Sequence, residues 1–357
     1  MKLIHTADLH LDSPMTAHLS IEKAKQRREE LRRNFGRLAE EGERLGVDCI
    51  LISGDLFDEK APSKRSRKYV LDVIAEHPAL RFFYLSGNHD GKEVLSEVGK
   101  LPENLFLFDE NWTTYTPFPG LTITGSTHPD ASTLNALPES SCNILLLHGQ
   151  VMSGTGKEES DLIYPERYRG KNLDYLALGH IHSYSSQKLD ARTTICYPGC
   201  LEGRGFDECG ERGYVLLERD EKELRHSFVP FAKRRVHLVE CDITGCESPL
   251  ELDARIESVL AGIPASDLVR LVFCGTYLPD FMPDLTATAQ SLSDRFFYAE
   301  VELAARPLIR KEDYENDISL KGEFVRTVLA DKMLTEEEAD RIILCGLRAL
   351  MGEEPIL

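Results

Sequence analysis

The sequence predicts an α/β fold with a parallel core, and three observations support this class. Apolar runs of strand length alternate with helical patterns in the first part of the chain. The segments between these runs are long enough for crossover helices, which parallel strands require. Several runs also end in residues that commonly bind metal ions. Ligands gather at the carboxyl ends of strands in such sheets, so the third observation agrees with the other two.

The first elements follow the strand–helix–strand pattern of a parallel sheet. Leu31, Phe35 and Leu38 fall on one face of a long helix that Gly46 ends. In order, the predicted elements are a strand at 2–4, a helix at 20–45, a strand at 47–52, a helix at 68–76 and a strand at 81–86.

The next part of the chain is richer in turn residues. The pattern of residues 101–140 predicts additional strands and a surface loop. We expect His128 to lie in a loop. Residues 151–172 predict a long loop over the site, before a strand at 174–182. Two further strands, at 194–199 and 213–218, suggest that a second, more antiparallel sheet completes the first domain.

The pattern restarts beyond Arg235, which predicts a second domain. Strands at 236–243, 269–273 and 297–303 alternate with helices at 248–261 and 284–294. Thr335 and Glu338 form a capping-box signature for the second of two final helices, at 320–332 and 335–352. A short helical pair cannot bury both apolar faces alone, so it docks on its own chain or on a partner. The predicted boundaries are 1–234, 235–305 and 306–357.

Five apolar runs end in residues of the metal-ligand type. Residues i and i+2 of a strand share a face, so His180 and His182 emerge together after the run at 175–178. The other runs, at 2–4, 49–52, 82–85 and 144–147, end in a similar way. The candidates are the carboxylates Asp8, Asp55 and Asp90, the amide Asn88, and the imidazoles His10, His89, His148, His180 and His182.

This set of donors indicates a centre with two divalent metal ions. Oxygen and nitrogen donors without thiolate favour Mn²⁺, Fe²⁺ or Zn²⁺. The candidates exceed one coordination sphere, whereas two ions bridged by one carboxylate would use them. Such a pair suits in-line hydrolysis at phosphorus.

Composition restricts the class of protein. No apolar run of 18 residues exists, so we expect a soluble, cytoplasmic protein without a membrane partner. The nine cysteines are scattered, which favours reduced thiols over a disulfide framework.

Charge is unevenly distributed along the chain. The net charge of −18 argues against a nucleic-acid partner. However, residues 236–357 hold 24 acidic and 11 basic side chains, and two stretches of the first part, 23–37 and 59–68, are basic. These stretches are either solvated helix faces or contacts to a phosphate backbone. For the second stretch, which follows Asp55, the candidate DNA contacts are Lys60, Lys64, Arg65 and Arg67.

The ordered motifs resemble those of the calcineurin-like metallophosphoesterases. They are Asp8-x-His10, Gly54-Asp55, Gly87-Asn88-His89-Asp90, His148-Gly149 and Gly179-His180-Ile181-His182. The stretches 5–11, 54–57 and 197–202 look more narrowly like SbcD-type DNA repair exonuclease subunits and their YhaO-like relatives. This resemblance covers residues 1–305. It implies a four-layer αββα sandwich with a small α/β capping domain, two Mn²⁺ ions and cleavage of DNA.

The resemblance also implies a role for each motif residue. Asp8, His10, Asp55 and His182 would hold one metal ion, and Asp55, Asn88, His148 and His180 the other. His89 would stabilise the transition state or protonate the leaving oxygen, with Asp90 orienting its ring. One departure is Cys200, where the nucleases usually have serine.

Partners follow from the same resemblance. Such nucleases act with an SMC-type, SbcC-like ATPase, for which the C-terminal helices are a candidate docking element, and a homodimer is suggested. Two alternatives stay open: a phosphodiesterase or phosphatase for small molecules on the same metal centre, and a non-catalytic scaffold subunit that binds the ATPase.

Overall fold

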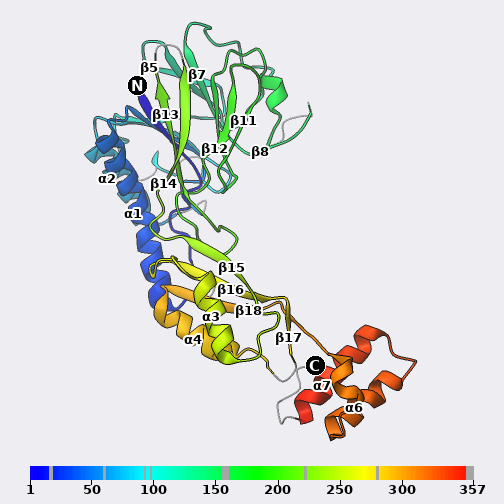
Figure 1. Cartoon of the computed structure of the whole chain (residues 1–357). Coiled ribbons are helices and arrows are strands. Elements are labelled where there is room, and N and C mark those ends of the chain that lie inside the picture. The colour runs from blue at the N-terminus through cyan, green and yellow to red at the C-terminus, as the bar shows by residue number, and fades with distance from the viewer. Residues whose placement is uncertain are drawn as a thin grey trace. The chain divides into compact units, whose positions relative to one another are not determined.

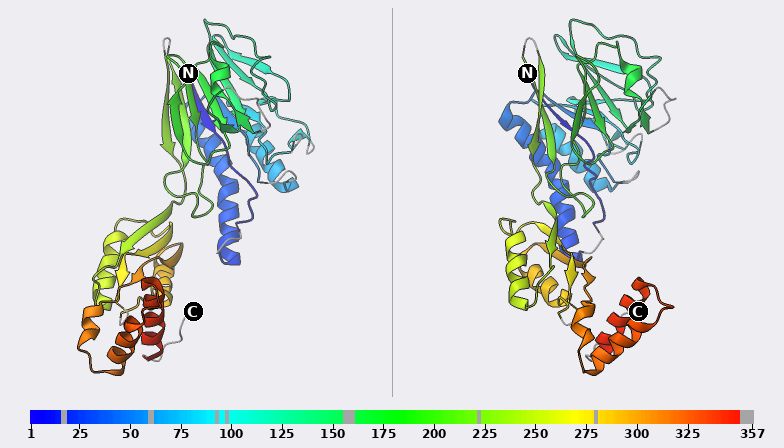
Figure 2. Two further views of the ribbon diagram at one scale, coloured as in Figure 1. Left: turned by 90° about the vertical axis from the view of Figure 1, so that its right-hand side faces the viewer. Right: turned by 45° about the vertical axis from the view of Figure 1, so that its right-hand side comes forward.

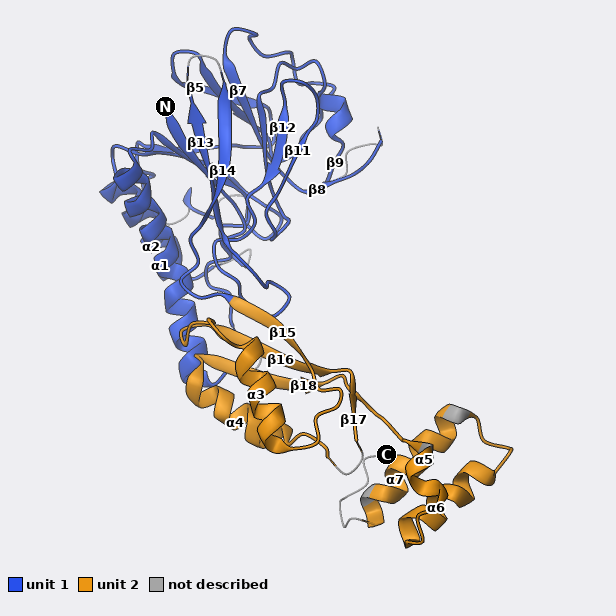
Figure 3. Ribbon diagram, viewed as in Figure 1, with its two compact units in different colours: residues 1–235 blue, residues 236–357 orange. Residues whose placement is uncertain are grey.

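The chain divides into two compact units, residues 1–235 and residues 236–357 (Figure 3). The structure is a computed structural model of the whole chain. It describes residues 1–15, 19–58, 62–91, 94–96, 99–154, 161–220, 223–278 and 281–350. Lys60, one of the candidate DNA contacts, lies outside the described residues.

A six-stranded mixed sheet forms one half of the first unit. Strands β1 to β4 run parallel to one another, and β13 pairs antiparallel with β1. In spatial order its strands are β14 (Leu224–Pro230), β13 (Gly213–Arg219), β1 (Lys2–Thr6), β2 (Cys49–Ser53), β3 (Arg81–Leu85) and β4 (Leu105–Leu107).

The second six-stranded sheet has a parallel centre. Strands β12, β10, β7 and β6 are parallel, whereas the edge strands β11 and β5 are antiparallel to their neighbours. In spatial order its strands are β11 (Ser185–Lys188), β12 (Thr194–Tyr197), β10 (Tyr175–Gly179), β7 (Cys142–His148), β6 (Leu121–Gly125) and β5 (Thr113–Phe118).

One expectation about these strands was wrong. The segments at 194–199 and 213–218 do not share an antiparallel sheet, because β12 belongs to the second sheet and β13 to the first. The chain crosses from one sheet to the other between these strands. Local patterns cannot reveal such a crossing, since both strands are apolar and either pairing buries them.

The two sheets pack face to face around a shared apolar core. Leu51 and Phe83 from the first sheet pack in this core with Ile144 and Ala177 from the second. The α/β class and the two central sheets are therefore confirmed. On the outer face of the second sheet, the described covering consists of loops and the 3₁₀ turn η2 (Pro165–Tyr168).

Two helices cover the outer face of the first sheet. Helices α1 (Ile21–Leu45) and α2 (Lys64–Glu76) lie side by side (Figures 1 and 2). Their apolar side chains pack on β2 and β3. Ser20 caps the amino end of α1, and Gly46, with φ 67°, ends it in the left-handed region. Ser63 caps α2 in the same way.

The second unit contains a small parallel sheet with its own core. Its strands in order are β15 (Val236–Asp242), β16 (Leu268–Cys274) and β18 (Tyr298–Leu303). Apolar side chains of α3 (Pro249–Val259) and α4 (Leu285–Arg295) complete this core. The short strands β17 (Thr276–Tyr277) and β19 (Arg306–Pro307) form a separate pair.

Three helices close the chain around a further apolar cluster. They are α5 (Lys311–Glu315), α6 (Leu320–Ala330) and α7 (Glu336–Leu350). The predicted capping box is confirmed: Glu338 N–H donates to Thr335 Oγ1 at 3.3 Å, and Thr335 N–H donates to Glu338 Oε2 at 2.8 Å. Within the described part of the chain, no helix has the length and apolar character needed to span a membrane.

Candidate metal centre

The candidate site forms where the carboxyl ends of β1, β2, β7 and β10 meet. Asp8 N–H donates to Gly54 O at 3.1 Å, and His10 N–H donates to Asp55 O at 3.0 Å. His180 N–H reaches both oxygens of the Asp8 carboxylate, at 2.9 and 3.1 Å. The loops after the strands are thus tied to one another across the two sheets.

Two glycines allow these loops to approach so closely. A Cβ atom at Gly179 would collide with Ser53 O and lie 2.8 Å from His148 Nδ1. A Cβ atom at Gly54 would collide with the same imidazole, and its φ of 91° is unfavourable for other residues. The glycines before Asp55 and His180 therefore make room for His148.

Four candidate ligands have left-handed backbone conformations. The φ angles are 52° for Asp8, 45° for His10, 50° for Asp55 and 103° for His180. Residues other than glycine rarely adopt such angles, and those that do cluster at functional sites.

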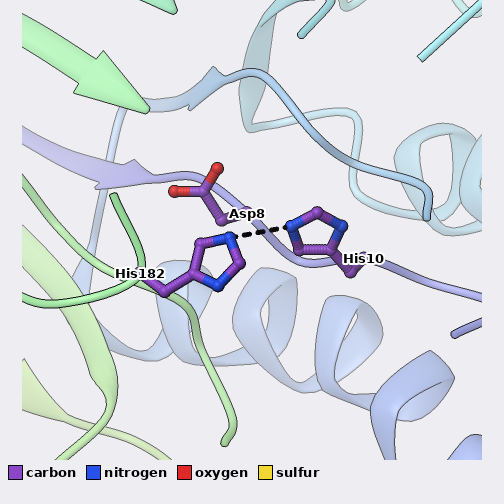
Figure 4. A group of neighbouring side chains, drawn as sticks. All are labelled: Asp8, His10 and His182. Carbon is purple, nitrogen blue, oxygen red and sulfur yellow. Dashed lines mark hydrogen bonds between the residues drawn. The ribbon is translucent and has the colours of Figure 1, made fainter. Parts of the chain in front are cut away.

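Among the described residues, three groups of ligand-type atoms lie within 4.8 Å of one another. The two that share Asp8 are the ligand groups of the predicted centre: Asp8, His10 and His182 form one, and Asp8, Asp55 and His148 form the other. The third consists of His10, Asp58 and His89. Figure 4 shows the first group, with His10 Nε2 and His182 Nε2 3.1 Å apart. Asp55 Oδ2 lies between the groups, 3.3 Å from His148 Nε2 and 3.9 Å from His10 Nε2.

Nearby oxygen atoms fix the tautomers of three imidazoles. The Nδ1 atoms of His10, His148 and His182 lie 3.0 Å from Asp58 Oδ1, 2.9 Å from Ser53 O and 2.6 Å from Glu208 Oε1. The Nδ1 atoms of His148 and His182 therefore carry a proton that they donate to the oxygen, and the Asp58 carboxylate favours the same tautomer in His10. Each Nε2 is left with a free lone pair.

When the imidazoles are neutral, these lone pairs face other lone pairs, and either a proton or a metal cation would relieve the repulsion. His10 Nε2 faces His182 Nε2, and His148 Nε2 lies 3.0 Å from Asn88 Oδ1. Two donors that are each about 2.1 Å from one metal ion would lie about 3.0 to 3.4 Å apart. The chain's own residues thus fit divalent metal ions in charge, donor type and spacing.

The pKa values of the buried groups also fit a site for cations. Burial raises the pKa of Asp8 to about 6. Burial would also raise the pKa of Asp55, but the hydrogen bond and charge of His148 lower it to about 2. For His148 itself, burial opposes the charge, yet Asp55 raises its pKa to about 9. A proton therefore balances these buried charges when no metal ion is bound.

The remaining predicted ligands line the same centre. Asn88 is exposed and reaches it through its contact with His148. The His180 ring packs edge-on against the His148 ring, with 5.4 Å between the ring centres. This ring is not a member of either ligand group, so metal binding by His180 stays a prediction.

The structure separates the two predicted catalytic residues. His89 is exposed, its N–H donates to Asp55 Oδ1 at 3.0 Å, and its ring centre lies 5.2 Å from that of His10. Its Nδ1 lies 3.1 Å from Asp58 O, so this carbonyl orients the ring. The expected contact from Asp90 is corrected: that buried carboxylate accepts the N–H groups of Leu56, Phe57 and Gly87.

Three residues near the histidines escaped sequence reasoning. Asp58 contacts His10, Glu208 contacts His182, and Arg204 donates to both carboxylates at 2.8 Å. Hydrogen bonds from His182 and Arg204 overcome burial and hold the pKa of Glu208 well below its usual range. In the sequence, the only indication of Arg204 and Glu208 is that they are charged residues in the glycine-rich loop after the strand at 194–199. An imidazole that binds a metal ion through one nitrogen usually donates the N–H of the other nitrogen to a carboxylate or a carbonyl oxygen.

The loop that carries Arg204 and Glu208 is also bonded to α1. Glu202 in this loop accepts hydrogen bonds from Arg27 at 2.7 Å and from Asn34 at 3.0 Å. Cys200 is buried beside them, with its Sγ 3.9 Å from Glu208 Oε2. The residue at this departure from the nuclease pattern therefore packs behind the centre.

The remaining candidate DNA contacts lie at the amino end of α2. Lys64 and Arg65 are exposed, whereas Arg67 is half-buried. Positive side chains at a helix amino end oppose the helix dipole, so local stability does not explain them.

The fold and the paired ligand groups define a metallophosphoesterase. The family model of the calcineurin-like phosphoesterases matches residues 1–188, which is more than half of the chain. The chain belongs to this family. Since that family hydrolyses phosphoesters at metal ions, the chain is a metal-binding hydrolase with a candidate dinuclear site.

Several curated proteins are similar to this chain. An uncharacterized metallophosphoesterase, YhaO of Bacillus subtilis, is 27% identical over 356 residues, which cover 90% of this chain and 83% of YhaO. The DNA double-strand break repair protein Mre11 of Methanopyrus kandleri is 27% identical, over 62% of this chain and 54% of that protein. Mre11 of Methanosarcina acetivorans is 23% identical, over 74% and 44%. The chain thus spans about half the length of these Mre11 relatives.

Solved structures with a similar arrangement include TT1561 of Thermus thermophilus, with a TM-score of 0.41 and 17% identity over 64% of this chain and 98% of that chain. A dimetal phosphatase from Danio rerio has a TM-score of 0.40 and 10% identity over 63% and 98%.

Proposed function

We propose that this chain is a Mn²⁺-dependent phosphodiesterase that hydrolyses DNA, as an exonuclease with a further capacity for endonuclease cleavage. The observation that carries the proposal is His89. It lies beside both ligand groups, with its backbone bonded to Asp55 and its ring held by Asp58 O. A purely structural metal site has no need of an exposed imidazole in this position.

Two divalent ions held by Asp8, His10, Asp55, Asn88, His148, His180 and His182 would polarise the phosphodiester and supply a nucleophile at neutral pH. Asp55, with Oδ2 between His10 and His148, is the residue placed to bridge the two positions. Their partners Asp58, Ser53 O and Glu208 keep the imidazoles in the binding tautomer before substrate arrives.

His89 acts on the substrate in this proposal. Asp58 O accepts its Nδ1 proton and leaves Nε2 for the phosphodiester. In the protonated ring, Nε2–H donates to a phosphoryl oxygen or to the leaving oxygen. Asp90 supports this step indirectly, because it holds the backbone of Gly87 and of the loop after Asp55 in place.

The choice of DNA rests on charge and on the relatives. Lys64, Arg65 and Arg67 follow the Asp55 loop, where they would neutralise backbone phosphates. The Mre11 relatives are named as DNA double-strand break repair proteins.

The same relationship suggests the partners and the location. We infer an SMC-type ATPase, of the SbcC kind, as partner of the helices in residues 306–357, a homodimer of the chain, and residues 235–305 as a capping domain. All nine cysteines are free thiols, which favours a reducing compartment such as the cytoplasm.

Hydrolysis with Mn²⁺ tests the proposal. Labelled linear duplex DNA, single-stranded DNA and bis-p-nitrophenyl phosphate are each incubated with the wild type, with His89→Ala and with His226→Ala. His226 is a matched control, because it lies on β14 and contacts Ser186. We expect hydrolysis of all three substrates by the wild type and a decrease in kcat of about 10²- to 10⁴-fold in His89→Ala.

Each other outcome has a definite meaning. Equal loss in His89→Ala and His226→Ala would assign the effect to the fold. Full activity of His89→Ala would favour the scaffold function, since hydrolysis would then not depend on the imidazole proposed to act on the substrate.

A small-molecule phosphodiesterase or phosphatase is the second candidate. A pocket of about 390 Å³ beside the centre, lined by Asn88, His148 and Asp161, favours it, because this pocket suits a compact substrate. Hydrolysis of the small diester with no hydrolysis of either DNA would support this candidate over the nuclease.

A further inference from the structure

A large groove runs along the exposed face of α1. It has a volume of about 1180 Å³, and the described residues that line it include seven basic and four acidic side chains. The basic ones on α1 are Lys25, Arg28, Arg32, Arg33 and Arg37, and Arg65 of α2 and Lys233 complete the set. The groove is therefore positive in a protein whose net charge is −18.

The acidic side chains of the groove neutralise only part of this charge. Glu29 is shared by Arg32 and Arg33, and Glu30 is buried among Arg27, Lys233 and Arg234. Within the described part of the chain, Lys25, Arg28 and Arg65 have no ion-pair partner. Burial and the nearby positive charge of Arg65 lower the pKa of Arg32, which agrees with crowding of cations.

The groove begins at the loop that carries the candidate metal ligands. Asp12, two residues after His10, lines the groove and accepts hydrogen bonds from Ser63 N–H and from the Ser66 hydroxyl. It thereby joins the loop after β1 to the amino end of α2. A polymer whose scissile bond lies at the centre would reach the groove without leaving the protein surface.

The length of the basic face fits several phosphates. Lys25 and Arg37 are twelve residues apart on α1, which corresponds to about 18 Å of helix. Successive phosphates of one strand of duplex DNA rise by about 3.4 Å, so this face spans about five of them. An arginine-rich row matches phosphate oxygens in charge and in donor geometry.

We propose that this groove binds the phosphate backbone of the polynucleotide substrate several nucleotides away from the scissile bond. The proposal rests on the proposed function, and it assigns DNA contacts to α1 in addition to those of α2, with Arg65 common to both sets. The contacts depend on charge and are independent of base sequence. They would increase the affinity for substrates long enough to occupy both the centre and the groove.

Salt dependence of DNA binding tests the groove. The full-length protein binds fluorescent duplex DNA in EDTA, which prevents hydrolysis, at a series of salt concentrations. Lys25→Gln/Arg28→Gln/Arg33→Gln should weaken binding and reduce the slope of log K against log[salt] by about 0.9 for each phosphate that the variant no longer neutralises, up to about 2.7. Glutamine is a good helix former, so α1 is expected to persist in this variant.

A charge-matched variant is the control. Lys2→Gln/Lys188→Gln/Arg225→Gln removes three positive charges at the opposite ends of the strands, where Lys2 and Arg225 both pair with Glu218 and Lys188 pairs with Thr194 in strand register. We expect a slope close to the wild-type slope. An equal decrease in both variants, or no decrease in the groove variant, would overturn the proposal.

The proposed function is tested separately by the small diester. If the wild type hydrolyses bis-p-nitrophenyl phosphate but the groove and control variants have equal salt slopes, the proposed hydrolysis stands and DNA binding by the groove is wrong. A wild type that hydrolyses no diester contradicts the proposed function, while the binding slopes still decide whether α1 contacts DNA.

Discussion

Glu208 determines which nitrogen of His182 is free for a metal ion. Its carboxylate raises the pKa of His182 through a hydrogen bond to Nδ1 at 2.6 Å, and Arg204 holds Glu208 in place. Glu208→Gln keeps the volume but removes the charge that orients and polarises the ring. We expect Mn²⁺ affinity to decrease about 10- to 100-fold, measured by isothermal titration calorimetry.

Glu211→Gln provides the matched control for this prediction. Glu211 is exposed and pairs with Arg235, so its loss should leave Mn²⁺ affinity unchanged. Unchanged affinity in Glu208→Gln would show that ring orientation is set elsewhere.

The candidate ligands could be predicted from the sequence for a local reason. Asp8, Asp55 and His148 lie at the end of an apolar strand or two residues beyond it, and the carboxyl ends of parallel strands share one edge. Asp58 and Glu208 could not be predicted in this way, because a carboxylate in a polar loop has no periodic pattern. The expected contact of Asp90 with His89 failed for a related reason: three backbone N–H groups compete for the same carboxylate.

At the scale of elements, a buried ionic network joins α1 to the chain after β14. Glu30 on α1 bonds Arg27, Lys233 and Arg234, at 3.0, 3.0 and 2.8 Å. Burial alone would raise the pKa of Glu30, but these hydrogen bonds lower it well below its usual range. Its charge therefore stabilises the fold at neutral pH, and this stabilisation is lost as pH decreases through the ordinary carboxyl range toward the folded-state pKa.

Glu30→Gln should reveal this network. We expect the free energy of unfolding of the first unit to decrease by about 3 to 5 kcal/mol at pH 7.5, because the buried guanidinium groups of Arg27 and Arg234 each lose one anionic partner. Urea unfolding at pH 7.5 and at progressively lower pH measures the difference, which should shrink on acidification.

Glu29, the neighbour of Glu30 on α1, is the control for this prediction. Glu29 is half exposed, so Glu29→Gln should cost less than about 1 kcal/mol. Equal effects of the two substitutions would contradict a special role for the buried carboxylate.

The sequence predicted where helices and strands begin and end more accurately than it predicted which strands pair. Helix α1 and the β15–α3–β16–α4–β18 unit match their predicted ranges closely, because apolar periodicity and caps are local. The assignment of β12 and β13 to different sheets depends on how the chain passes between them. No local pattern encodes that path.

At the scale of the whole molecule, the two units have separate apolar cores, so metal binding should stabilise only one of them. Scanning calorimetry with and without Mn²⁺ should show the transition of residues 1–235 at a higher temperature with the metal ion. The transition of residues 236–357 should stay unchanged. One site at 100 times its Kd adds about 2.7 kcal/mol.

Asp55→Asn is the control for the metal effect, because it weakens the ligand placed between both groups. We expect two Mn²⁺ per wild-type chain by metal analysis after dialysis, and no increase in melting temperature for Asp55→Asn. An equal metal-induced increase in both units would contradict binding at the strand ends.

The left-handed backbone conformations of four residues lower the stability of the fold while placing candidate ligands at the centre. These residues are Asp8, His10, Asp55 and His180. Each such conformation costs about 1 to 3 kcal/mol, which is a substantial part of the stability of a typical domain. Glycine at any one of these positions would relax the chain and remove a candidate ligand at the same time. Selection for thermal tolerance alone would therefore erode the metal centre first, and a stabilised descendant of this protein would be expected to keep its sheets and lose its chemistry.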